Sequence, residues 1–382
     1  MNNQVTLTAK LKLKNLTVDD INALTNTINN YSAALNYTAQ FVADNKLYFS
    51  SYAKIQTFVY NDIRNKFKLP SQMACSVCRI VIAKYKTLKT NKQLYIKDKK
   101  TGKQIINVPC FKPKEFDLVY NRDYSFTKSN LFSINTINGR QRYDFYIKGH
   151  EHFFDGTWAF GQAKIKKVKD SFYIYVSVSK TVETHIVNTV GVDLGLNFIA
   201  VSYNGNKTTF YSGKRAKEYR AHYKKLRQEL QSKNTKSSKR RLKAINEREN
   251  RYINDVNHCI TKALVRANPN SLFILEDLST IRPALAKVKK ADRYYMVSWS
   301  YGDFIEKLSY KALKSGSLVT EVDPSYTSQT CPVCGHIAKN NRNKSKHIFI
   351  CKACGYSSND DRIGAMNLYN KRVETVQLSI LN

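Results

Sequence analysis

Apolar and polar positions alternate at the beginning of the chain and again from about residue 95. Within residues 1–14, the alternation is typical of a half-buried β-strand. Residues 95–185 contain short runs rich in β-branched and aromatic side chains, including IINVPCF, SFTKSNLFSI, YDFYIKG and SFYIYVSVSK, which predict further strands. Because the first strand needs partners, we expect residues 1–14 and 95–185 to form one split β-barrel or sheet.

Between these strands, residues 15–94 show helical periodicity. Thr17 and Asp20 match a capping box, and an apolar stripe follows on one face of the predicted helix. Two more helices are expected over about 50–66 and 71–90. The pattern therefore predicts a helical unit inserted after the first strand.

The second half of the chain places carboxylates next to apolar segments. An apolar strand in 187–205 contains Asp193, and the run SLFILEDLS delivers Glu276 at the end of a second strand. Asp360 and Asp361 begin a predicted helix. A carboxylate is costly to bury unless it is paired or binds a metal. Carboxylates that converge from neighbouring elements can hold two Mg²⁺ ions for phosphodiester hydrolysis.

Two cysteine pairs lie between the second and third acidic motifs. Sixteen residues separate Cys331-x2-Cys334 from Cys351-x2-Cys354, and a glycine follows each pair. This spacing predicts one structural zinc ion in a closed four-thiolate site. A third CxxC, Cys75 and Cys78, has no second pair nearby and lies in a predicted amphipathic helix, so we interpret these residues as buried thiols.

The charge of the chain indicates a polyanionic partner. Lys and Arg total 63 against 29 acidic residues, which gives a formal charge of +34. Within 214–243 there are thirteen Lys or Arg and two acidic residues, so phosphate contacts are favoured over a merely solvated surface. Without an apolar leader or membrane-length segment, we expect no membrane partner and a cytoplasmic location. The candidate phosphate contacts in this stretch are Lys224, Lys225, Arg227, Arg240 and Arg241.

The combination of GVDLGLN, ILEDLS, the double CxxC and DRIGAMNLYN resembles the RuvC-like nuclease of TnpB proteins, which are related to type V CRISPR effectors. The resemblance covers about the C-terminal half. It implies an α+β multidomain protein, with an RNase H-like (RuvC) α/β nuclease domain at 186–327 and 356–382 and a zinc ribbon inserted at 328–355. The barrel (1–14 and 95–185) and the helical insert (15–94) would then be wedge and recognition domains.

The resemblance also implies catalytic roles for particular carboxylates. Asp193 matches the first RuvC aspartate and Glu276 the glutamate. The third motif usually reads Asp-x-Asn-Ala-x-x-Asn, and counting back six residues from Asn367 selects Asp361, with Asp360 as the alternative. Two departures from the motif, Ile363 and Gly364, affect local helix geometry and remove no metal ligand.

A member of this family is expected to be an RNA-guided DNA endonuclease of a transposable element. A guide RNA from the element's end would pair with one strand of a double-stranded target DNA beside a short flanking motif, and one site would cut both strands in turn. We expect a monomeric ribonucleoprotein that associates with the nucleoid when bound to DNA. Alternatives are a guide-RNA-dependent repressor that does not cut, and a protein-guided RNase H-like transposase.

Further residues are assigned by position alone. Contacts to the flanking duplex would come from helix 71–86 and the loop around 50–56. A basic lid between Glu276 and Trp299 would gate the site, and His336 and His347 are expected to be ordinary ribbon residues. The candidate duplex contacts are Ser51, Tyr52, Lys54, Gln56, Gln72 and Arg79, and the basic lid residues are Lys287, Lys289, Lys290 and Arg293.

Overall fold

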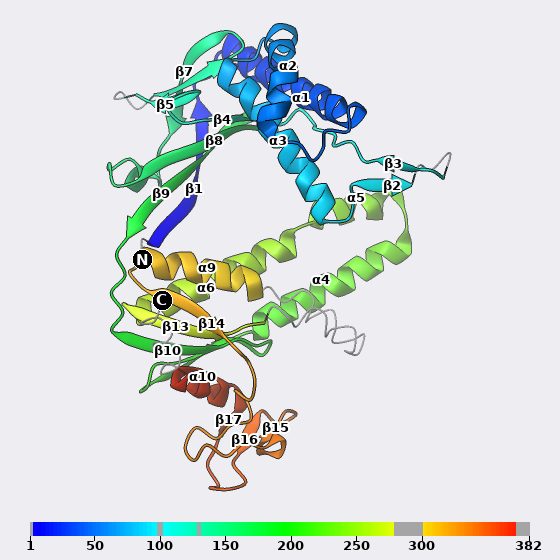
Figure 1. Ribbon diagram of the computed structural model, residues 1–382. Coiled ribbons are helices and arrows are strands. Elements are labelled where there is room, and N and C mark those ends of the chain that lie inside the picture. Colours follow the sequence, from blue (N-terminus) through cyan, green and yellow to red (C-terminus); the bar gives the residue numbers. More distant parts are fainter. Residues whose placement is uncertain (1–2, 98–101, 128–130, 279–300, 372–382) are drawn as a thin grey trace. The chain divides into compact units, whose positions relative to one another are not determined.

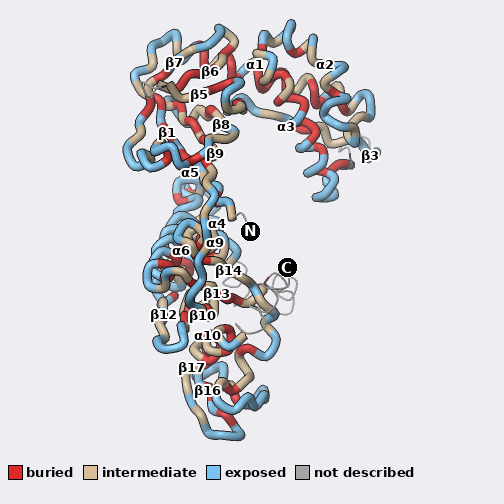
Figure 2. Tube along the Cα trace, turned by 60° about the vertical axis from the view of Figure 1, so that its left-hand side comes forward, coloured by how far each residue is buried: buried red, intermediate tan, exposed pale blue. Residues whose placement is uncertain are grey.

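The computed structural model describes residues 3–97, 102–127, 131–278 and 301–371 (Figure 1). It divides into two compact units, Met1–Val5 with Thr181–Asn382, and Thr6–Lys180. Figure 2 shows that buried positions follow the strands and one side of the helices within each unit. The four-domain division expected from the sequence remains a prediction.

A seven-stranded, barrel-like sheet dominates the unit Thr6–Lys180. The first strand lies between β9 and β7, so it finds its partners among the later strands, as the alternation predicts. Along β9 the side chains of Phe172, Ile174, Val176 and Val178 are buried, and those between them are partly exposed. In spatial order the strands are β4 (Glu115–Leu118), β8 (Ala159–Val168), β9 (Ser171–Val182), β1 (Asn3–Lys14), β7 (Gly139–Tyr146), β6 (Phe132–Thr136) and β5 (Tyr124–Phe126).

The run IINVPCF is not a strand of this sheet. Only β3 (Gln104–Ile106) forms there, and it pairs with β2 (Tyr95–Lys97) in a separate two-stranded sheet. Pro109 follows closely, and proline removes a backbone donor, which limits strand extension. The short 3₁₀ segment η1 (Glu151–Phe153) precedes β8.

Three helices form the insert: α1 (Val18–Asp44), α2 (Tyr52–Phe67) and α3 (Ser71–Thr90). The predicted capping box begins α1, because the Asp20 amide donates to Thr17 Oγ1 at 3.2 Å and the Thr17 amide donates to Asp20 Oδ2 at 2.9 Å. On α3, Cys78 is buried and desolvation raises its pKa to about 12, which agrees with a packed thiol.

A mixed five-stranded sheet organises the other unit. Its spatial order is β12-β11-β10-β13-β14, with β10, β13 and β14 parallel and β11 antiparallel to both β10 and β12. The parallel strands therefore end at the same edge. Their bounds are β10 (Asn188–Asp193), β11 (Phe198–Tyr203), β12 (Thr208–Ser212), β13 (Ser271–Glu276) and β14 (Leu318–Val322).

Helices cover both faces of this sheet. One face packs Val192 and Leu275 into an apolar core with α6 (Arg248–Ala267) and α9 (Tyr301–Lys314). The opposite face receives α10 (Asp360–Asn370), which lies against β10 and β11 (Figure 1). Because side chains alternate along a strand, this second face also carries the carboxylates that end β10 and β13.

The basic stretch folds as α4 (Lys214–Lys233) and α5 (Lys236–Ile245). From the sequence, the polar run SKNTKSSKRR predicts a break, and the periodicity that resumes through Leu242 and Val256 predicts one long helix after it. The structure has two helices there, because Glu247 adopts a left-handed backbone (φ 64°) between α5 and α6. The predicted break itself occurs at Asn234, which is also left-handed. No helix in the described part of the chain is both long and apolar enough to cross a membrane.

Candidate metal-binding active site

The first two predicted carboxylates lie side by side at the ends of parallel strands. In the β10–β13 register, Val192 is opposite Leu275, so Asp193 and Glu276 occupy the next paired position. Both side chains are partly buried and point to the face covered by α10. Asp193 and Glu276 are 83 residues apart in the sequence, and strand pairing brings them together in space.

Close packing of α10 on β10 brings the third motif to these strand ends. A Cβ at Gly191 would overlap the carbonyl oxygen of Ala365, so only glycine permits this approach. A Cβ at Gly364 would lie 3.0 Å from Cγ of Asp193, so this turn of α10 directly covers that carboxylate. Gly364, one of the two departures from the usual motif, therefore provides space for Asp193.

Asp360 and Asp361 occupy the first turn of α10 but have different surroundings. Asn359 caps the helix, its Oδ1 accepting from the amides of Asp361 and Arg362 at 3.1 Å. The Asp360 side chain is fully buried, and Arg342 Nε donates to its Oδ2 at 2.7 Å. Asp361 is partly exposed, and Arg342 Nη2 lies 3.8 Å from its Oδ1. The structure thus places Asp360 against the ribbon and leaves Asp361 more accessible.

All three predicted catalytic carboxyl groups have raised pKa values. Desolvation is the largest cause for each of them, and the charges of Glu276 and Asp361 raise the pKa of Asp193 further. The Thr327 hydroxyl donates to Glu276 Oε1 and partly offsets the rise in the Glu276 pKa. Desolvated carboxylates that repel one another at one sheet edge suit divalent cations, which favour their ionised form.

Thr327 is a site residue that the sequence patterns do not identify. It is buried, and Asn367 of α10 donates to the backbone oxygens of Thr327 at 2.7 Å and Thr330 at 2.8 Å. The last asparagine of the third motif therefore fixes the loop that orients Glu276. Threonine in SYTSQT carries no spacing signal that would have revealed this contact.

The four predicted zinc ligands come together in two matching turns. The Gly335 amide donates to the Cys331 carbonyl and the Gly355 amide to the Cys351 carbonyl, each at 3.0 Å, and both glycines have φ of 75°. The Cys331–Cys354 and Cys334–Cys351 sulfur distances are 3.6 and 3.5 Å. A tetrahedral site with Zn–S bonds of about 2.3 Å requires sulfur separations of roughly 3.8 Å. This donor set therefore fits a structural zinc ion.

The ribbon is continuous with the third carboxylate motif. Its sheet contains β15 (Arg342–Asn343), β16 (Ile348–Ile350) and β17 (Ser357–Asn359), after the 3₁₀ segment η3 (Lys339–Asn341). Ile363 of α10 packs with Phe349 and the buried cysteines Cys331 and Cys351. The zinc turns therefore support the helix that presents Asp361.

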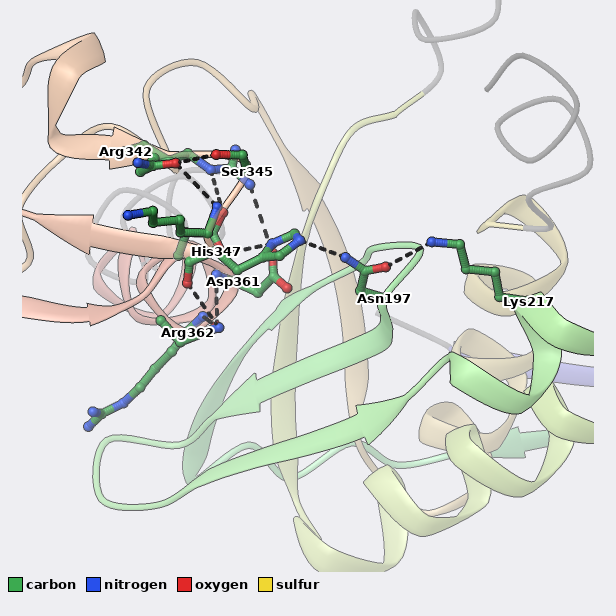
Figure 3. A network of polar contacts seen from close by, with 11 residues as sticks. Asn197, Lys217, Arg342, Ser345, His347, Asp361 and Arg362 are labelled. Atoms are coloured by element: carbon green, nitrogen blue, oxygen red, sulfur yellow. Dashed lines mark hydrogen bonds and ion pairs between the residues drawn. The ribbon is translucent and has the colours of Figure 1, made fainter. Parts of the chain in front are cut away.

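His347 does not behave as an ordinary ribbon residue. One ligand atom each from His347, Asp360 and Asp361 lie within 4.8 Å of one another, and His347 Nε2 is 2.7 Å from Asn197 Nδ2. Asn197, which follows the Asp193 motif, also accepts from Lys217 Nζ at 3.3 Å (Figure 3). His336, by contrast, is exposed in the ribbon.

The predicted phosphate contacts of the basic helices divide into two groups. Lys225, Arg240 and Arg241 are exposed and Lys224 is partly buried. Arg227 Nη2, however, donates to the buried carboxylate of Glu249 at 2.7 Å, so this guanidinium contributes to the packing of α4 on α6.

Several side chains predicted to contact the DNA duplex make contacts within the protein itself. Ser51 caps α2, the Arg79 guanidinium stacks 5.5 Å from the Tyr52 ring, and Gln56 donates to Cys75 Sγ at 3.2 Å. Gln72 accepts from Arg122 at 2.9 Å. Lys54 is exposed. The lid residues Lys287, Lys289, Lys290 and Arg293 lie outside the described residues.

Two family descriptions match the chain. Residues 301–368 match the Cas12f1-like TNB domain, and residues 172–284 match OrfB_IS605, described as a probable transposase. The chain is 29% identical to the TnpB-like protein MJ0751 of Methanocaldococcus jannaschii over 60% of this chain and 84% of that protein. It is 27% identical to the putative RNA-guided DNA endonuclease InsQ of Escherichia coli over 52% and 53% of the two chains.

Similarity to Cas12f proteins is found both in sequence and in fold. The chain is 36% identical to the CRISPR-associated endodeoxyribonuclease Cas12f1 of Sulfoacidibacillus thermotolerans, over 27% of this chain and only 22% of that protein. A solved Cas12f1–sgRNA–target DNA complex gives a TM-score of 0.60 at 13% identity, covering 97% of this chain and 99% of that one. The protein thus has a Cas12f-like α+β fold.

Proposed function

We propose that this chain, which belongs to the TnpB-like (OrfB_IS605) family related to the Cas12f type V effectors, is an RNA-guided DNA endonuclease of a transposable element. Its RuvC-like site hydrolyses phosphodiester bonds of double-stranded DNA beside a short flanking motif and requires Mg²⁺. Relatives named as an RNA-guided DNA endonuclease and as a Cas12f1 endodeoxyribonuclease support this proposal.

The observation that carries the proposal is that three desolvated carboxyl groups, two at one sheet edge and one in the first turn of α10, lie near enough for the charges of Glu276 and Asp361 to raise the pKa of Asp193. Asp193 and Glu276 end adjacent parallel strands, and Asp361 begins the helix packed over them. Their mutual repulsion has no evident structural benefit. Such an arrangement is expected where the protein must bind divalent cations.

These three carboxylates would hold the catalytic metal. A Mg²⁺ ion held there would supply activation of a water molecule and stabilisation of the departing 3′ oxygen of the scissile phosphate. Thr327 orients Glu276 by hydrogen bonding, and Gly364 allows α10 to approach Asp193. The Arg342 guanidinium, held by Asp360, presents a positive charge near Asp361 and can offset charge on an approaching phosphate.

The exposed cations of α4 and α5 are consistent with a nucleic-acid partner. Lys225, Arg240 and Arg241 face solvent, and the chain as a whole carries a formal charge of +34. A guide RNA together with a DNA heteroduplex would supply the opposing phosphates. The retained carboxylate set favours cleavage over a repressor that only binds, and a protein-guided transposase would need no RNA.

The test is to express the protein beside the DNA that flanks its gene, sequence the RNA that co-purifies, and assay cleavage of DNA matching that RNA. A discrete RNA with a constant scaffold and a short variable end, together with RNase-sensitive and Mg²⁺-dependent cleavage, is the expected result. Strand joining that resists RNase would support the transposase instead. Binding without cleavage by the wild-type protein would support the repressor.

A further inference from the structure

We infer that His347, Asp360 and Asp361 form a second cation site, which binds a transition metal and can be probed with Mn²⁺, on the ribbon side of the carboxylate centre. The three side chains come from two elements: His347 immediately precedes β16, and the two aspartates begin α10. This inference rests on the proposed function, because Asp361 would contribute both to the second cation site and to the proposed catalytic site with Asp193 and Glu276.

Two facing atoms at this position lack hydrogen-bond partners among the described residues. The Asp360 side chain is fully buried, and its Oδ1 and His347 Nδ1 are both inaccessible to solvent without a hydrogen bond. They lie 3.4 Å apart. An unsatisfied buried carboxylate oxygen is costly, and an ion that binds both atoms would remove that cost.

The separation is long for a direct hydrogen bond and is compatible with metal coordination. For metal–nitrogen and metal–oxygen bonds of about 2.1 Å, a tetrahedral angle places the two donor atoms roughly 3.4 Å apart. The observed distance between His347 Nδ1 and Asp360 Oδ1 equals that value. Asp361, with a carboxylate oxygen within 4.8 Å of both, can complete the protein ligands by a small side-chain rotation.

The surroundings also supply a partner for the other imidazole nitrogen. Ligating histidines usually donate their second N–H to an oxygen, which fixes the ring. Asn197 lies 2.7 Å from His347 Nε2, and rotating its amide by half a turn would present Oδ1 to that nitrogen (Figure 3). Lys217, the present partner of Asn197 Oδ1, is exposed and can turn toward solvent.

The chemistry of the ligands suggests which ion is bound. Carboxylates alone suit Mg²⁺ and Mn²⁺, whereas an imidazole ligand shifts preference toward Fe²⁺ or Zn²⁺. Arg342 occupies the other oxygen of Asp360, which leaves Oδ1 as the oxygen that faces His347. The site would therefore differ from the Asp193–Glu276 side of the centre, where the described donors are oxygens.

The experiment is electron spin-echo envelope modulation of Mn²⁺ added to the full-length, zinc-loaded protein, without RNA or DNA. A nitrogen ligand on Mn²⁺ produces a nitrogen modulation, and oxygen ligands do not. All seven histidines are in the described residues. Among them, His347 alone belongs to a group of side chains, with Asp360 and Asp361, that could hold a metal ion. We expect the modulation in the wild type, and one Mn²⁺ fewer per chain in His347→Asn.

His347→Asn is chosen because the backbone at this position is left-handed (φ 53°), which asparagine tolerates. His336→Asn is the matched control, and its modulation should be unchanged. Zinc content and thermal unfolding of both variants must match those of the wild type. If His347→Asn fails this check, the presence or absence of nitrogen modulation in the wild type still tests the inference. Mn²⁺ binding without nitrogen modulation, modulation that survives His347→Asn, or no Mn²⁺ binding would overturn the inference.

Cleavage assays separate this inference from the proposed function. Guided DNA cleavage by a protein whose bound Mn²⁺ shows no nitrogen modulation would overturn the His347 site and leave the nuclease proposal intact. Nitrogen modulation in a protein that never cleaves DNA would support the site and contradict the nuclease.

Discussion

The ribbon and the carboxylate centre are both candidate metal sites, but they are built in opposite ways. The ribbon's four ligands lie within 24 consecutive residues (331–354), and its two turns have the same hydrogen bonds. The carboxylate centre draws its side chains from positions 193, 276 and 361, which only strand pairing and helix packing bring near one another.

This difference in construction implies a difference in energetics. The four cysteines form a zinc site only when the ribbon is folded, so we expect zinc binding and folding of the ribbon to be coupled. The carboxyl groups are instead held by a sheet that folds around an apolar core of Val192, Leu275 and Phe304. The ribbon should therefore depend on its metal for structure, whereas the centre should be formed, and electrostatically strained, without one.

Cys351→Ser should produce the largest loss of stability. Structural zinc in small domains contributes on the order of 10 kcal/mol of apparent binding free energy, so removing one thiolate should unfold the ribbon and release the support of α10. Thermal unfolding and zinc content measure this effect. Cys259→Ser, at an exposed thiol outside the ribbon, should leave both unchanged. Equal stability of the two variants would contradict the coupling.

Asp360→Asn should be the next largest perturbation, because it leaves the guanidinium of Arg342 without its fully buried partner. Because Arg342 is partly exposed and stays near Asp361, losing this charge-assisted hydrogen bond should cost about 2–3 kcal/mol. Asp361→Asn is the matched control, since Arg342 is 3.8 Å from that carboxylate and neutralising it relieves repulsion with Asp193. Urea unfolding distinguishes them. A greater loss in Asp361→Asn would show that the roles of the two aspartates are reversed.

The carboxylate centre should make stability depend on pH when no divalent ion is added. The pKa values of Asp193, Glu276 and Asp361 are raised on folding, so the folded chain binds more protons than the unfolded chain. Below about pH 4 these groups are protonated in both states and their full contribution to the free energy of unfolding is present. As pH rises through the raised pKa values, this contribution is lost, by about 1.4 kcal/mol for each unit by which folding raises a pKa.

Asp193→Asn should flatten this pH dependence and stabilise the metal-free protein at neutral pH. Urea unfolding at a series of pH values measures both quantities. Added Mg²⁺ should stabilise the wild type more than the variant. Identical pH profiles for the two proteins would mean that the three carboxyl groups are not coupled.

Thr327→Val should have the smallest effect. The variant keeps the side-chain shape and removes the hydroxyl that donates to Glu276, a loss of about 1–2 kcal/mol. The pKa of Glu276 should rise further, so the pH at which cleavage is half-maximal should increase. Thr330→Val, whose hydroxyl bonds only the Tyr326 carbonyl among the described residues, is the matched control. An unchanged pH profile would remove Thr327 from the site.

The sequence reveals features that depend on short-range spacing. The capping box at Thr17, the CxxC turns and the alternation in β9 each arise from nearby residues, and the structure contains all three. Family membership could also be predicted, because several separated motifs occur in the expected order.

Features that depend on tertiary packing could not be predicted in this way. The left-handed Glu247 that divides the second basic helix has no glycine or proline to mark it. The contact of Arg227 with Glu249 requires knowing that α4 packs on α6. Likewise, the position of His347 beside Asp361 follows from the hairpin of β16 and β17, so spacing suggested only a ribbon residue.

The central claim is that Asp193, Glu276 and Asp361 form the catalytic centre of an RNA-guided nuclease. The most direct test compares cleavage of matched double-stranded DNA by wild-type and Asp193→Ala ribonucleoproteins in Mg²⁺, with target binding measured in parallel. We predict that the variant binds its target but cleaves either strand at least about 10³-fold more slowly, as expected when several kcal/mol of metal stabilisation are lost. Cleavage of either strand at the wild-type rate would contradict the claim.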